Sequence, residues 1–461
     1  MEMNNFLAKK NKRKGKNCPK VLFWSSSFIL FRNTLIGNLY EISQVYPVIL
    51  LLGEKIDSET EKILNNKKLF PKLQKIIFCE EPFNGKILVK NNHLYRTIKK
   101  TTKDYKPDIV VSAEDFYPGS LYLMRFAKKT GATTIAIQPG LKIAEQEKLY
   151  LWSCLVNSYM KMPNFLPLSV RLFFVKFKKY LGYFFYHWIL PLMMGEAPFR
   201  GKTSFIFWNE SSGLKDADYS VVFSKRDYDL CIKDGVPAKK LFILNHPLIR
   251  ENTKKFFEKT YFSNSLNKQK KYSKILTVML PAERIGFKRS DYSLIPEKKT
   301  QENKVRIVTL VADILKGWKI FIKPYPYALD ISEIKKIFEP ISNWATVVEP
   351  LEPADKYIKM SDVILGVPPA STTLFTASLR SPKKIVLSLD LNNEFLGDIY
   401  KNFNGIKYIN SEEKFIEVLN LISNNKYYQK SDIEKDSTFS DTNELLNYIY
   451  TQHLKNKQEI C

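Results

Sequence analysis

Short apolar runs alternate along this chain with longer segments of helical character, and this alternation limits the possible folds more than any other feature. Strands that are separated by helices pair in parallel, so the spacing predicts α/β architecture with parallel sheets. In the helical segment 297–316, for example, apolar residues recur at the spacing of one helix face. The strand-like runs are 20–25, 47–52, 75–79, 108–113, 133–137, 217–224, 274–280, 319–322, 346–348, 363–365 and 385–388.

The alternation falls into two units. A chain of 461 residues can hold two or three domains of ordinary size. We expect a first domain at 20–250, a Lys-, Asn- and Ser-rich linker at 251–273 and a second domain at 274–425. Residues 426–461 predict a polar tail or a C-terminal helix. Residues 1–19 are polar and basic and lack the apolar core of a signal peptide, so we expect a flexible basic arm on a cytoplasmic protein.

Residues 161–199 interrupt the alternation with a basic and strongly aromatic segment. Its uncharged run 180–195 falls short of the about 20 apolar residues that a membrane-spanning helix needs. Arg171, Lys176 and Lys178 among many aromatic rings suit a segment that lies on a bilayer surface. We therefore expect a helical insertion that contacts an anionic membrane. The alternative is a pair of core or dimer-interface helices.

The formal net charge is +25, from 72 Lys and Arg against 47 Asp and Glu. Such an excess attracts anionic partners: nucleic acid, lipid headgroups, nucleotides or acidic glycans. The basic residues are spread along the chain and match no known nucleic-acid-binding motif, so we expect no nucleic-acid partner.

The residues that could bind metal are dispersed. Five cysteines form no Cys-x-x-Cys pair, and the four histidines are far apart, which argues against zinc and against a disulfide scaffold. Asp216 and Asp218, like Asp227 and Asp229, match an Asp-x-Asp pattern, but they stand at a strand and a helix where a structural role is expected. The sequence thus predicts no metal and no cofactor.

Two turns in the second domain have the composition of a phosphate site. Lys-Pro-Tyr-Pro follows a strand-like run at 323–326. A later strand leads to Ser371, Thr372 and Thr373, just before the helical segment 374–379. Ligands of open α/β sheets bind at the carboxyl ends of strands, and helix N-termini offer free N–H groups to anions. The alternative is that the two prolines only form a rigid strand exit.

These motifs resemble the donor half of GT-B glycosyltransferases, most of all the branch that builds capsules, lipopolysaccharide and teichoic-type polymers. That branch commonly has Lys-Pro-His-Pro and a later Ser-Ser, which hold the phosphates of a nucleotide-activated donor. Here Tyr325 replaces the His, and a phenol can hydrogen-bond phosphate without acting as an acid near neutral pH. A second departure is Pro139, where the family often has the His of Gln-His-Gly. The resemblance implies two Rossmann-like domains whose parallel sheets face each other across a cleft.

The resemblance also assigns roles to residues. Arg284 stands in a turn similar to the family's Pro-Thr-x-Arg and would face the cleft. Glu349 or Glu352, after the strand 346–348, would bond ribose or base. On the acceptor side the expected residues are Ser25, Ser26 and Gln138, although the serines could instead cap the following helix. The expected nucleotide- and phosphate-binding residues are Arg284, Lys323, Tyr325, Glu349, Glu352, Ser371, Thr372 and Thr373.

Glycosyl transfer needs a base for the acceptor hydroxyl. Asp115 or Glu114, at the end of a strand in the first domain, is the expected catalytic residue. The alternative is that these carboxylates cap the helix 119–129. His246, at the domain junction, fits a structural hinge better, and Asp362, which opens a strand, is expected to be structural.

Together these observations predict a metal-independent glycosyltransferase that moves a sugar from a nucleotide-activated donor to a surface-glycan or lipid-linked acceptor, at the inner face of the membrane. Three alternatives share the scaffold. A glycerophosphotransferase of the teichoic-acid kind would use a nucleotide-glycerol donor. A sugar-nucleotide epimerase would carry more acidic and histidine residues in its cleft. A catalytically degenerate module would only bind, and Tyr325 and Pro139 favour that alternative.

Overall fold

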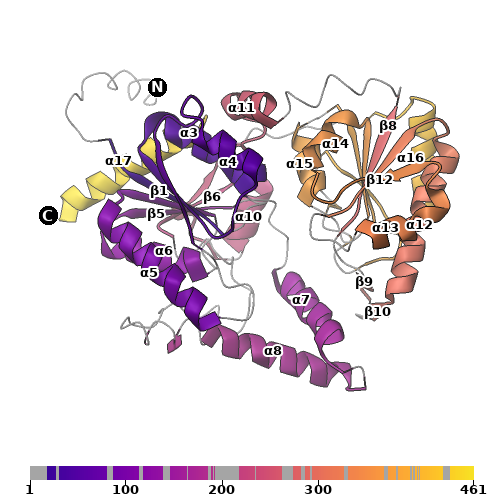
Figure 1. Cartoon of the computed structure of the whole chain (residues 1–461), viewed down its shortest axis with the longest axis horizontal. Coiled ribbons are helices and arrows are strands. Elements are labelled where there is room, and N and C mark those ends of the chain that lie inside the picture. Colours follow the sequence, from indigo (N-terminus) through magenta and orange to yellow (C-terminus); the bar gives the residue numbers. More distant parts are fainter. Residues whose placement is uncertain are drawn as a thin grey trace.

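The computed structural model contains two α/β domains, each built on a parallel sheet (Figure 1). The predicted α/β architecture is therefore confirmed. The structure describes residues 18–26, 31–79, 87–113, 118–138, 146–163, 165–184, 188–189, 192, 217–233, 235–261, 274–281, 286–290, 293–325, 331–352, 354–367, 372–380, 383–394, 397, 400–401, 403, 405–428 and 437–460.

The N-terminal domain has a seven-stranded parallel sheet with the order β3-β2-β1-β4-β5-β6-β7. Its strands are β1 (Val21–Ser25), β2 (Val48–Leu52), β3 (Leu73–Phe78), β4 (Ile109–Ala113), β5 (Thr133–Ile137), β6 (Tyr219–Val222) and β7 (Leu241–Ile243). Its helices are η2 (Phe31–Leu35), α3 (Ile36–Val45), α4 (Ser58–Asn65), α5 (Ile87–Tyr105), α6 (Pro118–Lys129), α10 (Lys225–Lys233), η4 (Ala238–Lys240) and α11 (Glu251–Tyr261).

The C-terminal domain has a six-stranded parallel sheet with the order β12-β11-β8-β13-β14-β15. Its strands are β8 (Ile275–Met279), β11 (Lys319–Lys323), β12 (Ala345–Val347), β13 (Val363–Gly366), β14 (Ile385–Leu389) and β15 (Lys407–Ile409), and β9 (Gly286–Phe287) pairs with β10 (Leu294–Ile295) as an antiparallel hairpin. Its helices are α12 (Glu297–Ile314), α13 (Ile331–Ile337), η5 (Glu339–Ile341), α14 (Ala354–Met360), α15 (Thr372–Arg380) and α16 (Glu412–Ser423).

Both sheets are covered by helices on their two faces, which explains their continuous apolar strands. In β1, Val21 and Phe23 pack into a core shared with α3 and α11, whereas Leu22 and Trp24 pack against α5 and α6. The C-terminal sheet divides its side chains in the same way between α12 and α16 on one face and α14 and α15 on the other. The period of two along each strand therefore fixes which helix lies on which face.

Aspartate side chains bind the amino ends of neighbouring strands in both sheets. The Asp108 carboxylate accepts a hydrogen bond from Lys20 N (2.8 Å), that of Asp218 from Thr134 N (2.9 Å) and that of Asp362 from Ile275 N (2.8 Å). Each aspartate precedes one strand and binds the start of its neighbour. These side chains serve the register of the sheets, at the edge opposite to the one where ligands bind in such folds.

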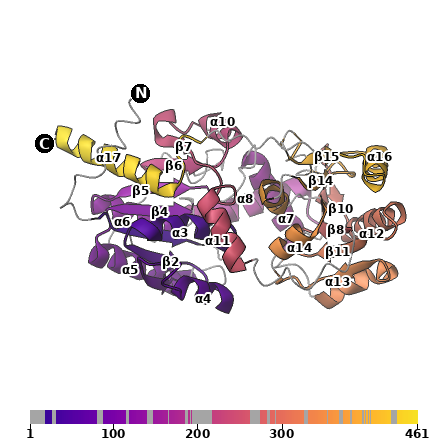
Figure 2. The same cartoon turned by 90° about the horizontal axis from the view of Figure 1, so that it is seen from above.

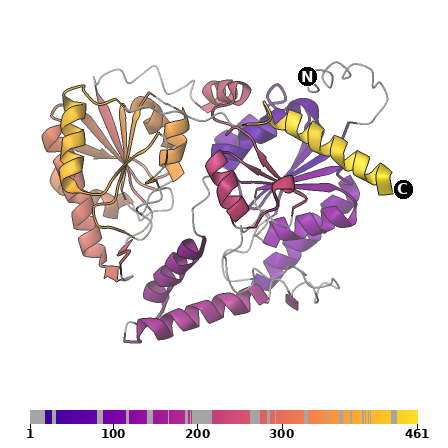
Figure 3. The same ribbon diagram turned by 180° about the vertical axis from the view of Figure 1, so that it is seen from behind.

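Two helices and the β9–β10 hairpin form a separate small cluster. Helices α7 (Gln146–Lys161) and α8 (Leu168–Phe184) follow β5; α8 lies within the expected helical insertion 161–199, whereas α7 precedes it. Phe287 of the hairpin packs on Leu155 of α7, and its ring lies 5.5 Å from that of Tyr159. Figure 3 shows α7 directed toward the C-terminal domain and α8 along the lower edge of the molecule. Among the described residues, no helix combines the length and the apolar character needed to cross a bilayer.

The segments expected as linker and tail are partly helical. Residues Glu251–Tyr261 form α11, which buries Phe256 and Phe257 in the N-terminal core. Helix α17 (Thr442–Ile460) returns from the C-terminal domain and inserts Leu445 and Leu446 into that same core. Figure 2 shows α17 lying along the N-terminal domain. The helix α17 agrees with the C-terminal helix expected in 426–461, whereas the charged composition of 251–261 hides the apolar residues that pack α11.

A buried ion pair joins three segments that are remote in sequence. The Arg250 guanidinium, just before α11, pairs with Glu41 of α3 and donates to Thr442 Oγ1 (2.7 Å) and to Asn38. Glu41 also accepts from Thr442 N (2.9 Å) at the start of α17. Burial raises the pKa of Glu41 and lowers that of Arg250, and each is offset in part by the charge of the other.

We predict that Arg250→Met lowers the free energy of unfolding by about 3–5 kcal/mol, because it leaves the Glu41 carboxylate buried without a countercharge. Urea denaturation would measure the loss. Lys255→Met is the matched control, since Lys255 forms an exposed pair with Glu251 one turn later on α11, and it should leave the midpoint unchanged. The double replacement Glu41→Leu and Arg250→Met should recover part of the loss. If Arg250→Met and Lys255→Met lowered the free energy of unfolding equally, this assignment of the buried pair would be wrong.

Candidate functional site

The carboxyl ends of the two sheets approach each other at the domain junction. Arg32 stands in η2, soon after the end of β1, and Lys323 is the last residue of β11 in the other domain. Their charges interact closely enough for Arg32 to lower the pKa of Lys323. Helix α7 and the β9–β10 hairpin, which follow β5 and β8, are in contact on the same side. The junction is therefore lined by the strand ends where ligands of α/β sheets bind.

His246 forms a second bridge between the domains. Its ring meets Phe223 of the N-terminal domain edge to face, with centroids 4.8 Å apart, and Phe375 of α15 at 5.5 Å. The imidazole is buried, and its Nδ1 accepts a hydrogen bond from Leu248 N (3.3 Å). These contacts fit the hinge role expected for His246.

Lys323 is a buried cation that clamps two turns. Its ammonium donates to the carbonyl oxygens of Pro324 (2.6 Å) and Pro350 (2.7 Å). Burial lowers the pKa of Lys323 to about 8; the negative charge of Glu352 opposes this change and the positive charge of Arg32 adds to it. An ammonium has three donors, so these two carbonyls leave a third for a ligand. The side chain thus both shapes the turn at the end of β11 and carries charge there.

The acidic candidates near this turn are held in ion pairs. Glu352 accepts from Lys356 Nζ and from Tyr357 OH, both at 2.7 Å. Burial raises the pKa of Glu352, but these hydrogen bonds and the charges of Lys356 and Lys323 outweigh it, and the pKa is lowered overall. Glu349 is exposed and lies 3.5 Å from Lys335. Tyr325, which follows the clamped turn, is partly exposed.

The hydroxyl-rich turn leads into α15 next to the end of β13. Thr372 begins the helix and Thr373 is half-buried on its first turn, whereas Ser371 lies outside the described residues. Gly366, the last residue of β13, has no space for a side chain: a Cβ there would lie 2.4 Å from Cδ1 of Leu374. The glycine therefore lets α15 pack directly against the strand end.

The structure describes the acceptor-side candidates but not the catalytic ones. Ser25 and Ser26 are buried at the end of β1, and Gln138 is buried at the end of β5. The helical segment after β1 begins with η2 at Phe31, and α3 continues from it with Leu35 at its N-cap. The catalytic candidates Glu114 and Asp115, and Arg284 of the donor side, lie outside the described residues.

A polar cluster at the end of β14 escaped the sequence analysis. Asp390 accepts hydrogen bonds from Arg289 (2.7 Å), from Tyr408 OH (2.9 Å) and from Glu394 N (2.7 Å). Burial raises the pKa of Asp390, and the hydrogen bonds and the Arg289 charge offset this only in part. Asp390 lies just after the strand that the sequence predicts at 385–388, so this position could have marked it as a candidate. Arg289 lies 101 residues earlier, so nothing in the sequence indicated the pair.

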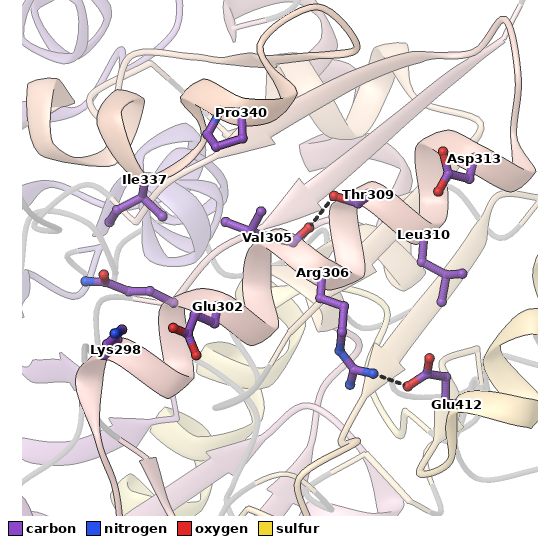
Figure 4. Close-up of a pocket in the computed structure, with 11 residues that line it drawn as sticks. Lys298, Glu302, Val305, Arg306, Thr309, Leu310, Asp313, Ile337, Pro340 and Glu412 are labelled. Carbon is purple, nitrogen blue, oxygen red and sulfur yellow. Dashed lines mark hydrogen bonds and ion pairs between the residues drawn. The ribbon is translucent and has the colours of Figure 1, made fainter.

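The outer face of the C-terminal domain has a separate cavity of about 720 Å³ (Figure 4). Apolar Val305, Leu310 and Ile337 line it, and the Arg306–Glu412 ion pair closes one side. None of the candidate residues lines this cavity. Within the described residues, no group of three or more His, Cys, Asp or Glu is placed to hold a metal ion.

Comparison with solved structures establishes the fold. The S. aureus MnaA–UDP complex matches with a TM-score of 0.54 at 13% identity, over 94% of this chain and 96% of that chain. A UDP-GlcNAc 2-epimerase from Neisseria meningitidis, bound to UDP-GlcNAc, matches with a TM-score of 0.52 at 14% identity, over 94% and 100%. The glycotransferase of kitacinnamycin matches with a TM-score of 0.50 at 10% identity, over 89% and 91%.

The chain thus has the GT-B fold of two Rossmann-like domains, as the resemblance implied. At such low identities the likeness extends to the fold alone. No protein-family model and no curated protein matches the sequence.

We predict that Gly366→Ala lowers the free energy of unfolding by about 1–3 kcal/mol, because the added methyl group overpacks the contact between β13 and Leu374. Urea denaturation of four proteins would test the cause: wild type, Gly366→Ala, Leu374→Ala and the double variant. In the Leu374→Ala background, the cost of the alanine at 366 should disappear. A cost that persists there would mean that the backbone, and not this contact, requires the glycine.

Proposed function

We propose that the protein is a nucleotide-sugar-dependent glycosyltransferase. The C-terminal domain binds the donor, and the N-terminal domain holds the acceptor. The observation that carries this proposal is the buried ammonium of Lys323 at the carboxyl end of β11, within electrostatic reach of Arg32 in η2 of the other domain. A nucleotide diphosphate at this edge would pair with the Lys323 charge and add to the Asp57 carboxylate that already binds Arg32, and guanidinium and ammonium groups are the usual partners of phosphate.

The donor diphosphate would lie between the β11 turn and the start of α15. Lys323 supplies an N–H and a positive charge, Tyr325 a phenol, and Thr373 a hydroxyl, with Ser371, Thr372 and Arg284 as further proposed contacts. The N-terminus of α15 adds its positive dipole end. These groups would stabilise the negative charge that develops on the departing diphosphate, and this role requires no metal.

The transfer breaks the bond between the anomeric carbon and the diphosphate oxygen and forms one to the acceptor hydroxyl oxygen. The acceptor proton would pass to Asp115 or Glu114, at the end of β4. Glu349 is the proposed contact to ribose or base, because its carboxylate is exposed. Glu352 would act mainly through the turn, since Lys356 and Tyr357 already bind it.

Ser25, Ser26 and Gln138 are the proposed acceptor-side residues. The acceptor would be a surface glycan or its lipid-linked precursor, as in the synthesis of capsule or lipopolysaccharide. Such an acceptor would bring the enzyme to the inner face of the membrane.

A sugar-nucleotide epimerase is the second candidate. It is favoured by epimerase structures that match over nearly the whole chain. The two reactions leave different products from UDP-GlcNAc, because an epimerase needs no acceptor and yields an isomeric sugar, whereas a transferase releases UDP only when an acceptor is present. Product analysis with and without a glycan acceptor separates them. Turnover of a nucleotide-glycerol donor would instead identify a glycerophosphotransferase, and binding without turnover a degenerate module.

We predict that one of UDP, CDP, CMP, GDP, ADP and TDP raises the melting temperature without added metal. A ligand at a hundredfold excess over its Kd stabilises the folded state by about 2.7 kcal/mol. Lys323→Met should abolish the shift, and Lys319→Met, at the other end of the same strand, should keep it. If no nucleotide shifts the wild-type transition, or if Lys323→Met leaves the shift intact, the donor site is not at this edge.

The affinity for that nucleotide should depend on the protonation of Lys323. It should fall as the pH rises through the pKa of about 8, by about tenfold per pH unit well above it, because the neutral amine no longer attracts phosphate. Isothermal titration across this range would measure it. Lys384 also has a pKa lowered by burial to about 8, but it lies before β14, at the opposite edge of the sheet. Lys384→Met should therefore keep the pH dependence, and a wild-type affinity that does not fall above pH 8 would contradict this role of Lys323.

A further inference from the structure

Helix α8 has one face that holds it to the rest of the molecule. Val175 and Arg171 are buried on that face, and Leu172 is packed against α7 and the β9–β10 hairpin. The Arg171 guanidinium lies over the ring of Tyr159, 4.4 Å from its centroid. Arg171 therefore directs its positive charge toward the ring of Tyr159 inside the protein and not toward solvent.

The opposite face of α8 is apolar and exposed. Six large side chains on it have between 37% and 63% of their surface exposed: Phe173, Phe174, Phe177, Tyr180, Leu181 and Phe184. At about 100° per residue they fall within roughly 120° of one another, on the side away from Val175. The rings touch one another, with Phe173 stacked on Phe177 at 6.1 Å and against Phe174 at 5.7 Å. We call these six residues the aromatic face.

Figures 1 and 3 both show α8 along the lower edge of the molecule, below the two sheets. The exposed apolar surface continues beyond the helix, where Trp188 stacks on Phe184 at 6.2 Å and Ile189 and Leu192 are exposed. A contiguous apolar surface of this kind marks an interaction site.

Lysines border the aromatic face on both sides. Lys176 and Lys178 are exposed, and the helical period puts them about 100° to either side of its centre. The sequence has no Asp or Glu between Lys161 and Gly195. A second copy of this chain docked face to face would bring these lysines against like charges, and it would add to a net charge of +25. An anionic bilayer offers phosphates to the lysines and acyl chains to the rings.

We propose that the aromatic face of α8 docks in the plane of an anionic lipid bilayer, with Lys176 and Lys178 on the headgroup phosphates. The buried face of α8 meanwhile stays on α7 and on the β9–β10 hairpin, whose Arg289 pairs with Asp390 at the end of β14. The docked helix would thus hold the carboxyl ends of both sheets near the lipid surface. The purpose of this docking, access to a lipid-linked acceptor, rests on the proposed function. The test of the docking itself needs no substrate.

Flotation of the full-length protein with vesicles tests the proposal, using phosphatidylcholine alone and phosphatidylcholine with phosphatidylglycerol. We expect the wild type to bind the anionic vesicles and not the neutral ones. Lys176→Gln with Lys178→Gln should weaken binding roughly thirtyfold. Phe173→Ser, Phe177→Ser and Leu181→Ser together should abolish it. Trp344→Ser with Tyr428→Ser removes exposed aromatic rings elsewhere and should change nothing.

Wild-type binding that the α8 serine variant retains, or that does not depend on anionic lipid, would overturn the proposal. A second result would also overturn it. If the wild type does not bind vesicles, and light scattering shows a dimer that the serine variant dissociates, the aromatic face joins two copies of the chain instead. The lysine variant changes only exposed side chains and keeps the test valid if the serine variant does not fold. The nucleotide-induced melting shift, measured on the same variants, reports on the donor site separately: flotation without that shift counts against the proposed function alone.

Discussion

The buried pair between Arg250 and Glu41 holds this architecture together. Two opposite charges without water stabilise each other only when their geometry is right and their remaining donors and acceptors are satisfied. Here Thr442 and Asn38 supply some of those additional bonds, whereas Glu41 Oε1 and Arg250 Nε are buried without a hydrogen-bond partner. The network joins α3, the start of α11 and the start of α17, which lie up to 404 residues apart. The chain therefore leaves the N-terminal domain and returns to it at a single anchored point.

That anchor determines how the donor-side edge meets the other domain. The chain leaves it for the C-terminal sheet and comes back through α17, and the rings of His246 and Phe375 form a contact between the domains nearby. Lys323 then lies within electrostatic reach of Arg32. Arg32 is paired there with Asp57 (3.2 Å), and the charge of Glu352 partly offsets the burial of Lys323, so an anionic ligand would add to charges that are already partly neutralised. Protein stability and ligand binding are in this way linked through the same junction.

The fold alone does not choose among reactions. The GT-B scaffold is shared by the epimerase and glycosyltransferase structures that match this chain, and function depends on the residues at the strand ends. The residues of this chain that bear on the choice are the clamped turn at Lys323 and the insertion formed by α7 and α8. The insertion is also where exposed aromatic side chains lie next to exposed lysines. This combination suits the lipid interface that we propose for α8.

The sequence by itself determined the elements and their pairing, because the period of two in strands and the longer amphipathic segments between them are local signals. It also indicated that Lys323 stands at the end of a strand and Thr373 at the start of a helix, as the structure has them. Only the tertiary structure decided which side chains contact each other. Arg32 with Lys323, Arg289 with Asp390 and Arg250 with Glu41 are pairs separated by long stretches of chain, and no local pattern encodes them. The same reason applies to α8, because only packing decides that the face with Arg171 and Val175 is buried and the aromatic face is exposed.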